Sequence, residues 1–472
     1  MDLRNWLTTA VDSYEKWAGE FGGYDTHPAL QVSEERFAEA FGELAGRLRD
    51  NYPFFHPRYA GQMLKPPHPA AIAGYVAAMQ INPNNHALDG GPATAAMERE
   101  VVAQLATMFG FGDQHLGHLT TSGTIANLEA LYVARESHPG LGVAYSADSH
   151  YTHARMCQLL GVPAFAVDSD ALGRIDLGAL ADLLEGGQVG TVVLTAGTTG
   201  LGAVDQIQDA LALRERYGVR LHVDAAYGGF FTLLADGSAD GVAPDPWRAI
   251  ASCDSIVVDP HKHGLQPYGC GAVLFADPSV GRFYQHDSPY TYFTSDELHL
   301  GEISIECSRA GAAAAALWLT FRLLPPTPGG LGEVLRPGRR AALRWASLLA
   351  GSDVLAPYQE PELDIVAYLP QLDPPLLTSI DAASAAIMDA GMTDPVDPVF
   401  LATYGVTAEA LAARGHAVVQ GEGAPGEGRG RILRSVLMKP ESEEYVGRLH
   451  SRVEELSRKV VLPGDPGVAA PV

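Results

Sequence analysis

Cysteine is scarce in this sequence, and the few cysteines present are scattered. Only four occur among 472 residues, and no two are spaced as a Cys-x-x-Cys pair: Cys157, Cys253, Cys270 and Cys307. Disulfide frameworks and structural zinc sites both need paired or clustered cysteines. The sequence therefore indicates neither a disulfide-stabilised secreted protein nor a zinc protein.

The sequence also has few basic residues and no long apolar run. The chain has 32 Lys and Arg against 56 Asp and Glu, a formal charge of -24, which repels phosphate backbones and anionic lipid surfaces. No apolar run approaches the roughly 20 residues of a membrane span. The N-terminus, "MDLRNWLTTAVDSYEKWAGEFGGY", lacks the continuous apolar core of a secretory signal. We therefore expect a cytoplasmic protein without nucleic-acid or membrane partners.

Core-forming residues are plentiful. Hydrophobic residues make up 47% of the chain and charged residues 19%, which is typical of a folded globular protein. Residues 1 to about 50 are predicted to be helical, with Trp6, Val11, Tyr14 and Trp17 on one face. From about residue 95, short apolar strands alternate with amphipathic helices. This alternation indicates an α/β fold with a mostly parallel sheet covered on both faces.

The length exceeds the usual size of a single core, so more than one domain is expected. A proline- and glycine-rich segment, "LLPPTPGGLGEVLRPG" at residues 323–338, is the best candidate for a boundary, and a smaller α+β pattern follows it. We expect an N-terminal helical segment over residues 1–85, a large domain over 86–330 and a small C-terminal domain over 331–472.

Unusual residues stand where the predicted strands end, which is where parallel sheets bind ligands. Asp224 ends the apolar strand of "RLHVDAAYGG", and a buried carboxylate there needs a cation or strong donor. Lys262 follows the strand of "SIVVDPHKHG"; an amine taken out of water loses proton affinity and can attack a carbonyl. Taken singly, each residue also has a purely structural explanation: Asp224 as a turn cap or a member of an ion pair, and Lys262 as an ordinary surface lysine.

The third feature is a helix start that could bind phosphate. In "HLTTSGTIANL" the small and hydroxyl residues Thr121, Ser122, Gly123 and Thr124 precede a helix, although ordinary N-capping also uses such residues. A phosphate site, a carboxylate and an amine together match the needs of pyridoxal phosphate (PLP): the lysine forms a Schiff base, the carboxylate keeps the ring nitrogen protonated, and the helix terminus binds the phosphate.

The ordered motifs resemble those of the PLP-dependent group II amino acid decarboxylases, such as the glutamate, tyrosine and aromatic amino acid decarboxylases. "DPHKHGLQPYGCG" resembles the cofactor-lysine signature, "SADSHYTHARM" the segment of the stacking histidine, and "TTSGTIANL" the phosphate loop; "HVDAAYGG", "TAGTTGLGAVDQI" and "ECSRAG" also match. The resemblance runs from about residue 50 to about residue 440. It implies PLP fold type I, like aspartate aminotransferase: a large domain with a seven-stranded, mostly parallel sheet and a small C-terminal α+β domain. It also implies a homodimer.

The resemblance assigns roles to individual residues. Lys262 forms the Schiff base, Asp224 holds the ring nitrogen, His150 stacks on the ring and Ala226 packs beneath it. The other cofactor-binding residues that it implies are Thr121, Ser122, Gly123, Thr124, Thr198, Ser255, His261 and Ser308.

The sequence departs from the family in two places. The phosphate loop has Ser122 and Ile125 where the family usually has Gly and Glu. In aromatic amino acid decarboxylases a mobile-loop tyrosine protonates the substrate carbon, whereas "SPYTYFTSDELHLGEISIECSRAG" has no tyrosine after Tyr292. We take Tyr292 as the candidate proton donor; the alternatives left open are Tyr290, His299 and His150.

The resemblance implies decarboxylation of an L-amino acid to its amine. Two alternatives stay open. Transamination, decarboxylation-coupled oxidation or carbon–carbon cleavage use the same cofactor, because cofactor motifs do not fix which bond is broken. A non-catalytic PLP-sensing regulator would need a DNA-binding arm, which the charge of -24 disfavours.

Substrate carboxylates would need a cation, and Arg58, Lys65 and Arg434 are the candidates.

Overall fold

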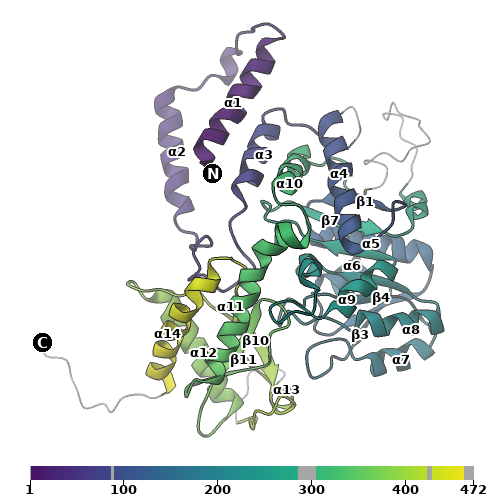
Figure 1. The fold of residues 1–472 in the computed structure, drawn as a ribbon, viewed down its shortest axis with the longest axis vertical. Helices are drawn as coiled ribbons and strands as arrows, with labels where there is room; N and C mark the ends of the chain where they lie inside the picture. The colour runs from purple at the N-terminus through teal and green to yellow at the C-terminus, as the bar shows by residue number, and fades with distance from the viewer. Residues whose placement is uncertain (1, 87–89, 285–303, 422–427, 462–472) are drawn as a thin grey trace, which may run out of the picture.

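Two β-sheets organise the chain. The computed structural model describes residues 2–86, 90–284, 304–421 and 428–461. The larger sheet and its helices form the right-hand part of Figure 1, and the smaller sheet with its helices lies below and to the left. Two N-terminal helices rise above both.

The larger sheet has seven strands in the order β1-β7-β6-β5-β4-β2-β3. Neighbours from β3 to β6 pair in parallel, whereas β7 is antiparallel to both β6 and β1. The expectation of a mostly parallel seven-stranded sheet is therefore confirmed. The strands are β1 (Leu116–Thr120), β2 (Gly142–Ser146), β3 (Ala164–Val167), β4 (Val189–Thr195), β5 (Arg220–Asp224), β6 (Ser255–Val258) and β7 (Gly271–Phe275).

Helices cover this sheet on both faces, so its central strands are buried. Every residue of β4, β6 and β7 is buried, as expected for strands packed on both sides. The pairing register sets Thr195 opposite Asp224, and Asp224 opposite Val257, so the carboxyl ends of β4, β5 and β6 meet at one edge. The connecting helices are α5 (Gly123–Ser137), α6 (Thr152–Leu160), α7 (Leu177–Glu185), α8 (Ile207–Tyr217) and α9 (Pro244–Ala249).

The smaller sheet is antiparallel, with four strands in the order β10-β11-β9-β8. It packs against helices through a core that includes Trp345 and Tyr368, whose rings lie 5.3 Å apart. Its strands are β8 (Leu355–Pro357), β9 (Ile365–Pro370), β10 (Ala402–Thr407) and β11 (Arg429–Val436), and the helices are α11 (Glu333–Ala350), α12 (Leu377–Thr393), α13 (Ala408–Ala412) and α14 (Ser442–Val461).

The break between the two sheet units is shorter than the proline- and glycine-rich sequence predicts. Residues 323–338 were expected to be irregular, but α11 begins at Glu333 and continues through Pro337. Proline near a helix start removes one backbone hydrogen bond. The apolar face of α11, with Trp345 and Leu349 fully buried, outweighs that loss.

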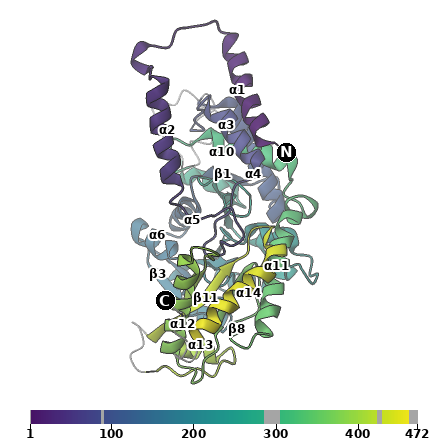
Figure 2. The same ribbon diagram turned by 90° about the vertical axis from the view of Figure 1, so that its left-hand side faces the viewer.

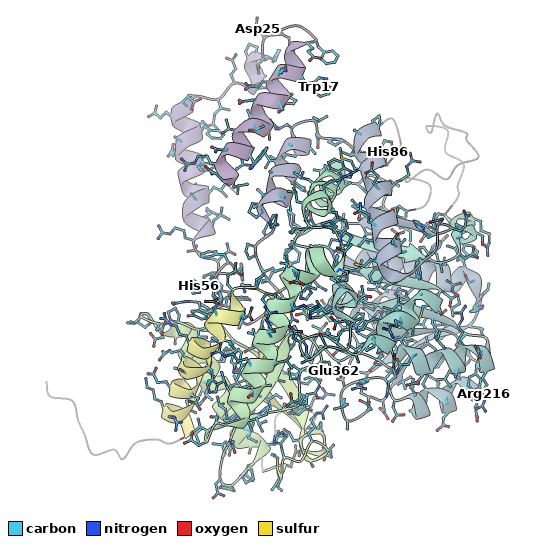
Figure 3. The ribbon with its side chains drawn as sticks, in the orientation of Figure 1. Trp17, Asp25, His56, His86, Arg216 and Glu362 are labelled. Atoms are coloured by element: carbon cyan, nitrogen blue, oxygen red, sulfur yellow. The ribbon has the colours of Figure 1, made fainter. Side chains whose placement is uncertain are left out.

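The N-terminal helices extend away from the rest of the chain. α1 (Leu3–Gly19) packs on α3 (Pro69–Met79), which packs with α10 (Gly311–Leu323) beside α4 (Pro92–Phe109). Figure 3 labels Trp17 and Asp25 near the tip of this projection. The predicted helical N-terminus is confirmed, but α2 (Glu34–Leu48) has no buried residue at all. Among the residues described, no helix is both long and apolar enough to span a membrane.

Candidate functional site

A cavity of about 260 Å³ lies where β4, β5 and β6 end and where α5 and α6 begin. Most residues singled out in the sequence meet here, although they come from segments more than 100 positions apart. The cavity is lined by Thr121, Ser122, Gly123, Thr124, Asn127, His150, Tyr151, Thr152, Thr195, Gly197, Thr199, Asp224, Ala226, Tyr227, Asp259, His261, Lys262 and Tyr268.

Lys262 stands in the turn that follows β6, with its amine held beside a carboxylate. Its Nζ lies 3.0 Å from Oδ2 of Asp259, which is almost fully buried. His261 supports the same turn, because its Nδ1 donates to the carbonyl oxygen of Cys270 at 2.8 Å. This contact holds the amine at the cavity wall. Asp259 was not assigned a role from sequence, although it stands in the same motif.

The same turn is fastened to the smaller sheet by His263. Its Nε2 lies 2.9 Å from Oδ2 of Asp364, and its Nδ1 lies 3.0 Å from the carbonyl oxygen of Tyr227. The Tyr227 hydroxyl donates to the other oxygen of Asp364 at 2.5 Å. Burial raises the pKa of Asp364, but the charge and hydrogen bond of His263, the hydrogen bond from Tyr227 and the charge of Lys65 together lower it by more, so the carboxylate is ionised. Both nitrogens of His263 therefore face oxygen acceptors, one from each side of the contact between the two sheets.

Asp224 ends β5 with both carboxylate oxygens in hydrogen bonds. Oδ2 accepts from Nε2 of His153 at 2.9 Å, and Oδ1 accepts from the backbone N–H of Ala226 at 3.1 Å. Burial is the largest single influence and raises the pKa of Asp224, but the hydrogen bond and charge of His153, the N–H of Ala226 and the charge of Lys262 together outweigh it and hold the pKa well below its usual range. Asp224 is therefore ionised at neutral pH, the form that can hold a protonated ring nitrogen. His153 was missed in the sequence, where it resembles any helical residue.

His150 lies just before α6 on the cavity wall. Its Nδ1 accepts the backbone N–H of Thr152 at 3.2 Å, so the proton of the neutral ring is on Nε2. Burial is the largest cause that lowers the pKa of His150. An uncharged, planar ring at neutral pH is suited to stacking on an aromatic ligand.

The start of α5 forms the opposite end of the cavity. The Ser122 hydroxyl caps this helix by accepting the N–H of Ile125 at 3.3 Å, and the N–H groups of Gly123 and Thr124 have no acceptor within the helix. A Cβ at Gly123 would come within 2.6 Å of Asp259 Oδ2, so only glycine fits there. The N–H and hydroxyl of Thr121 instead donate to Glu306, at 2.9 and 2.5 Å.

The cavity walls also carry buried polar atoms that are unsatisfied within the described part of the chain: Oγ1 of Thr152, Oγ1 of Thr195 and Oδ1 of Asp259. Buried polar atoms are normally hydrogen-bonded, so three in one cavity indicate a polar ligand. An amine, an ionised carboxylate, an uncharged imidazole and a helix N-terminus fit the aldehyde, ring nitrogen, ring face and phosphate of PLP.

The comparison with protein families identifies the family to which the chain belongs. The pyridoxal-dependent decarboxylase conserved domain matches residues 31–329, well over half of the chain. The chain belongs to the PLP-dependent group II amino acid decarboxylases. It is therefore a PLP-dependent carboxy-lyase that acts on amino acids, and the expectations for family, fold, cofactor and reaction are confirmed.

Individual relatives agree with this assignment. The chain is 27% identical over 423 residues to an L-tyrosine decarboxylase of Enterococcus faecium, covering 68% of this chain and 69% of the relative. It is 32% identical over 314 residues to a probable L-aspartate decarboxylase of Halobacterium salinarum, covering 66% and 82%. The fold is similar to that of Catharanthus roseus tryptophan decarboxylase in complex with L-tryptophan, with a TM-score of 0.74, 16% identity and coverage of 93% and 91%.

Ser255 of this decarboxylase supports the cavity from behind rather than lining it. Its hydroxyl lies 2.9 Å from Nδ1 of His222, whose Nε2 donates to Asn127 at 3.0 Å. Asn127 in turn donates to the carbonyl oxygen of Gly123 at 2.9 Å. Burial lowers the pKa of His222 to about 3, so this ring is neutral and the chain of hydrogen bonds has one direction. It ties the start of α5 to β5 and β6.

Several other predicted residues are not brought to the cavity in the single chain. The Thr198 hydroxyl accepts the N–H of Ala203 at 3.0 Å, and its neighbours Gly197 and Thr199 line the cavity instead. Ser308 accepts from Asn84 at 3.1 Å. The cofactor roles of Thr198, Ser255 and Ser308 stay predictions. The proton-donor candidates Tyr290, Tyr292 and His299 lie outside the described residues.

The three cations proposed for a substrate carboxylate are widely separated. Arg58 pairs with Asp397 at 3.4 Å, and Lys65 donates to the carbonyl oxygen of Met438 at 3.3 Å; neither lines the cavity. Arg434 does lie close, in a second cavity of about 360 Å³. His150, Tyr151 and Thr199 line both cavities, so Arg434 is reached from the cofactor site.

Proposed function

We propose that this decarboxylase converts an L-amino acid to its amine on PLP attached to Lys262. The observation that carries the proposal is that the Lys262 amine, the ionised Asp224, the uncharged His150 and the start of α5 line one cavity. When bound, PLP supplies a protonated ring that withdraws the electron pair left behind by CO2.

Each residue has a distinct task in this proposal. Lys262 would hold PLP through its aldehyde carbon, and Asp259 and His261 orient the turn that carries the lysine. Asp224 would keep the ring nitrogen protonated, and its charge is effective there because the carboxylate is buried. His150 and Ala226 enclose the ring from its two faces. The phosphate would bind at the start of α5, through the N–H groups of Gly123 and Thr124 beside Ser122. Thr121, whose N–H and hydroxyl donate to Glu306, stays a predicted phosphate-binding residue.

Mass spectrometry of the products tests this function and identifies the substrate. PLP-loaded enzyme is incubated with the proteinogenic amino acids and their acidic and diamino relatives. An amine that has lost CO2 from its parent supports the proposal. A keto acid or an aldehyde as the main product would replace it with transamination or decarboxylation-coupled oxidation on the same cofactor.

We also propose that Arg434 binds a carboxylate of the substrate. Its guanidinium donates to the carbonyl oxygens of Gly200 at 2.8 Å, Thr199 at 2.5 Å and Gly61 at 3.3 Å. Within the described chain it has no carboxylate partner, although the residue is only 4% exposed. A guanidinium has five N–H donors, so donors remain for a ligand after the three carbonyl contacts. A buried cation that faces a cavity without its own counter-charge is a ready site for an anion.

The substitution Arg434→Lys tests this role. We expect KM for the substrate to rise about 10- to 100-fold, because a charged hydrogen bond contributes about 1.5–3 kcal/mol and lysine cannot bind a carboxylate through two parallel bonds. The matched control is Arg431→Lys on the same strand, since Arg431 pairs with Asp381 at 2.7 Å outside the cavity. Equal KM values for the two variants, both folded by circular dichroism, would contradict the proposal.

We propose that the enzyme is a homodimer in which α2 contacts the second subunit, with residues 1–85 as the dimerisation segment. Four apolar side chains recur along α2 at helical spacing, and all are more than half exposed in the single chain: Phe37 (61%), Phe41 (59%), Leu44 (51%) and Leu48 (59%). Such a continuous apolar face on a projecting helix is costly in water, and a copy of the same helix would cover it.

Light scattering tests the dimer. The wild-type enzyme should have twice the mass of the chain, and the double substitution Phe37→Glu/Phe41→Glu should shift it to the mass of one chain, because two carboxylates would be buried in the apolar interface. Glu39→Gln on the same helix is the control and should remain dimeric. A wild-type monomer would refute the proposal.

We propose that the enzyme acts in the cytoplasm without nucleic-acid or membrane partners. The formal charge of -24 supports this, since it opposes binding to anionic surfaces. Recovery of the native enzyme in a membrane fraction, or its retention on DNA at low salt, would contradict it.

A further inference from the structure

The carboxylate that faces the cofactor ring has a buried partner outside the cavity. His153 is fully buried, and its Nε2 lies 2.9 Å from Oδ2 of Asp224, whose side chain is 6% exposed. His153 lies three residues after His150, one turn further along the chain at the start of α6. This segment therefore presents one histidine to the cavity and a second to the carboxylate beside it.

The hydrogen bonds of this pair fix its orientation. An ionised carboxylate only accepts, so Nε2 of His153 carries the shared proton. Nδ1 of His153 is buried and unsatisfied among the described residues, so the ring's only polar contact there is with Asp224. The second oxygen of Asp224 accepts the N–H of Ala226 at 3.1 Å. One donor on each oxygen, from His153 and from the backbone of Ala226, holds the carboxylate in place.

Removal of His153 would change both the charge and the direction of Asp224. Oδ2 of Asp224 would lose its hydrogen-bond donor while it stays buried. A buried, charged oxygen without a donor is strongly disfavoured. The carboxylate would then rotate toward other donors or bind a proton. Either change would weaken its interaction with a protonated ring nitrogen.

We propose that His153 is a positioning residue, which holds Asp224 ionised and directed at the ring nitrogen of PLP and thereby keeps that nitrogen protonated. The inference rests on the proposed role of Asp224. His153 acts through Asp224 and does not itself line the cavity.

The test measures the ring nitrogen directly. Enzyme is loaded with PLP labelled with 15N in the ring, and the 15N chemical shift is followed between about pH 6 and 9. In the wild type the nitrogen should stay protonated throughout. In His153→Phe it should lose its proton within this range, and kcat should fall about 10- to 100-fold, as is usual when the partner of a directly acting residue is removed, with KM little changed. His153→Gln, whose amide can donate, should restore most of both properties.

Two further variants separate the possible failures. If Asp224→Asn deprotonates the nitrogen but His153→Phe and His153→Leu do not, the inference about His153 is wrong and the role of Asp224 stands. If Asp224→Asn also leaves the nitrogen protonated, the proposed role of Asp224 itself fails. His450→Phe is the matched control, because it removes another buried histidine near a carboxylate, Glu454 at 3.6 Å, in the smaller sheet unit. If His153→Phe does not fold, the 15N chemical shift of the ring nitrogen is compared between His153→Leu, which should lose the ring proton, and His153→Gln, which should keep it.

Discussion

Substitution of Lys262 by alanine is expected to reduce kcat/KM for amine formation by about 10³-fold or more, on the scale of losing a residue that bonds covalently to the reacting group. The amine at the cavity wall is the group that can attach the PLP aldehyde, and alanine offers none. The visible absorbance of lysine-bound PLP should disappear from the variant, and mass spectrometry should detect no amine above background.

The control for this experiment is another lysine in a different setting. Lys459 lies on α14, exposed and paired with Glu455 at 2.7 Å, so Lys459→Ala should retain both the absorbance and the activity. If Lys262→Ala kept the absorbance, the cofactor would be attached elsewhere, and Lys439, which is buried, and Lys65, which is partly buried, would be the next residues to replace.

The second large effect is expected for Asp224→Asn. An amide cannot keep a ring nitrogen protonated by charge, and removal of one electrostatic contact to the reacting group typically costs about 10²- to 10³-fold in kcat. The absorbance of lysine-bound PLP should persist, because Lys262 and the start of α5 remain. The loss should therefore appear in kcat and not in cofactor content.

Asp254→Asn is the matched control for Asp224→Asn. Asp254 directly precedes β6 and lies beside the start of β5, at the other end of these strands from Asp224. There it accepts the N–H of Leu221 at 2.8 Å. Its loss should affect the melting temperature and leave kcat per folded enzyme near wild type. Equal losses of kcat in the two variants would mean that the sheet, and not the ring nitrogen, is what Asp224 supports.

The residues at the strand ends could be predicted because their signals are local. A charged residue directly after an apolar strand is unusual, and the carboxyl ends of parallel strands meet at one edge, so Asp224 and Lys262 were expected to lie together. The same holds for the hydroxyl residues before α5. The edge strand β3 (Ala164–Val167) gave too little signal, since it has four residues and only Val167 is buried.

Residues that depend on distant segments could not be found in this way. His153 and Thr195 have no local feature that distinguishes them from core residues, and their roles appear only when α6 and β4 meet β5. The cations show the same limit. Arg58 and Lys65 lie before the alternating strands and helices, and nothing in the sequence shows where their side chains point. The structure places Arg58 beside Asp397 and Lys65 beside Met438. Arg434, from the far end of the chain, lines the second cavity next to the cofactor site instead.

The most direct test of the central assignment is chemical trapping of the cofactor. Reduction of the PLP-loaded enzyme with borohydride makes the bond between PLP and its lysine permanent, and peptide mapping by mass spectrometry then locates the modified residue. The account predicts a single pyridoxyl adduct on the peptide that contains Lys262. A stoichiometric adduct on any other lysine, with Lys262 unmodified, would contradict it.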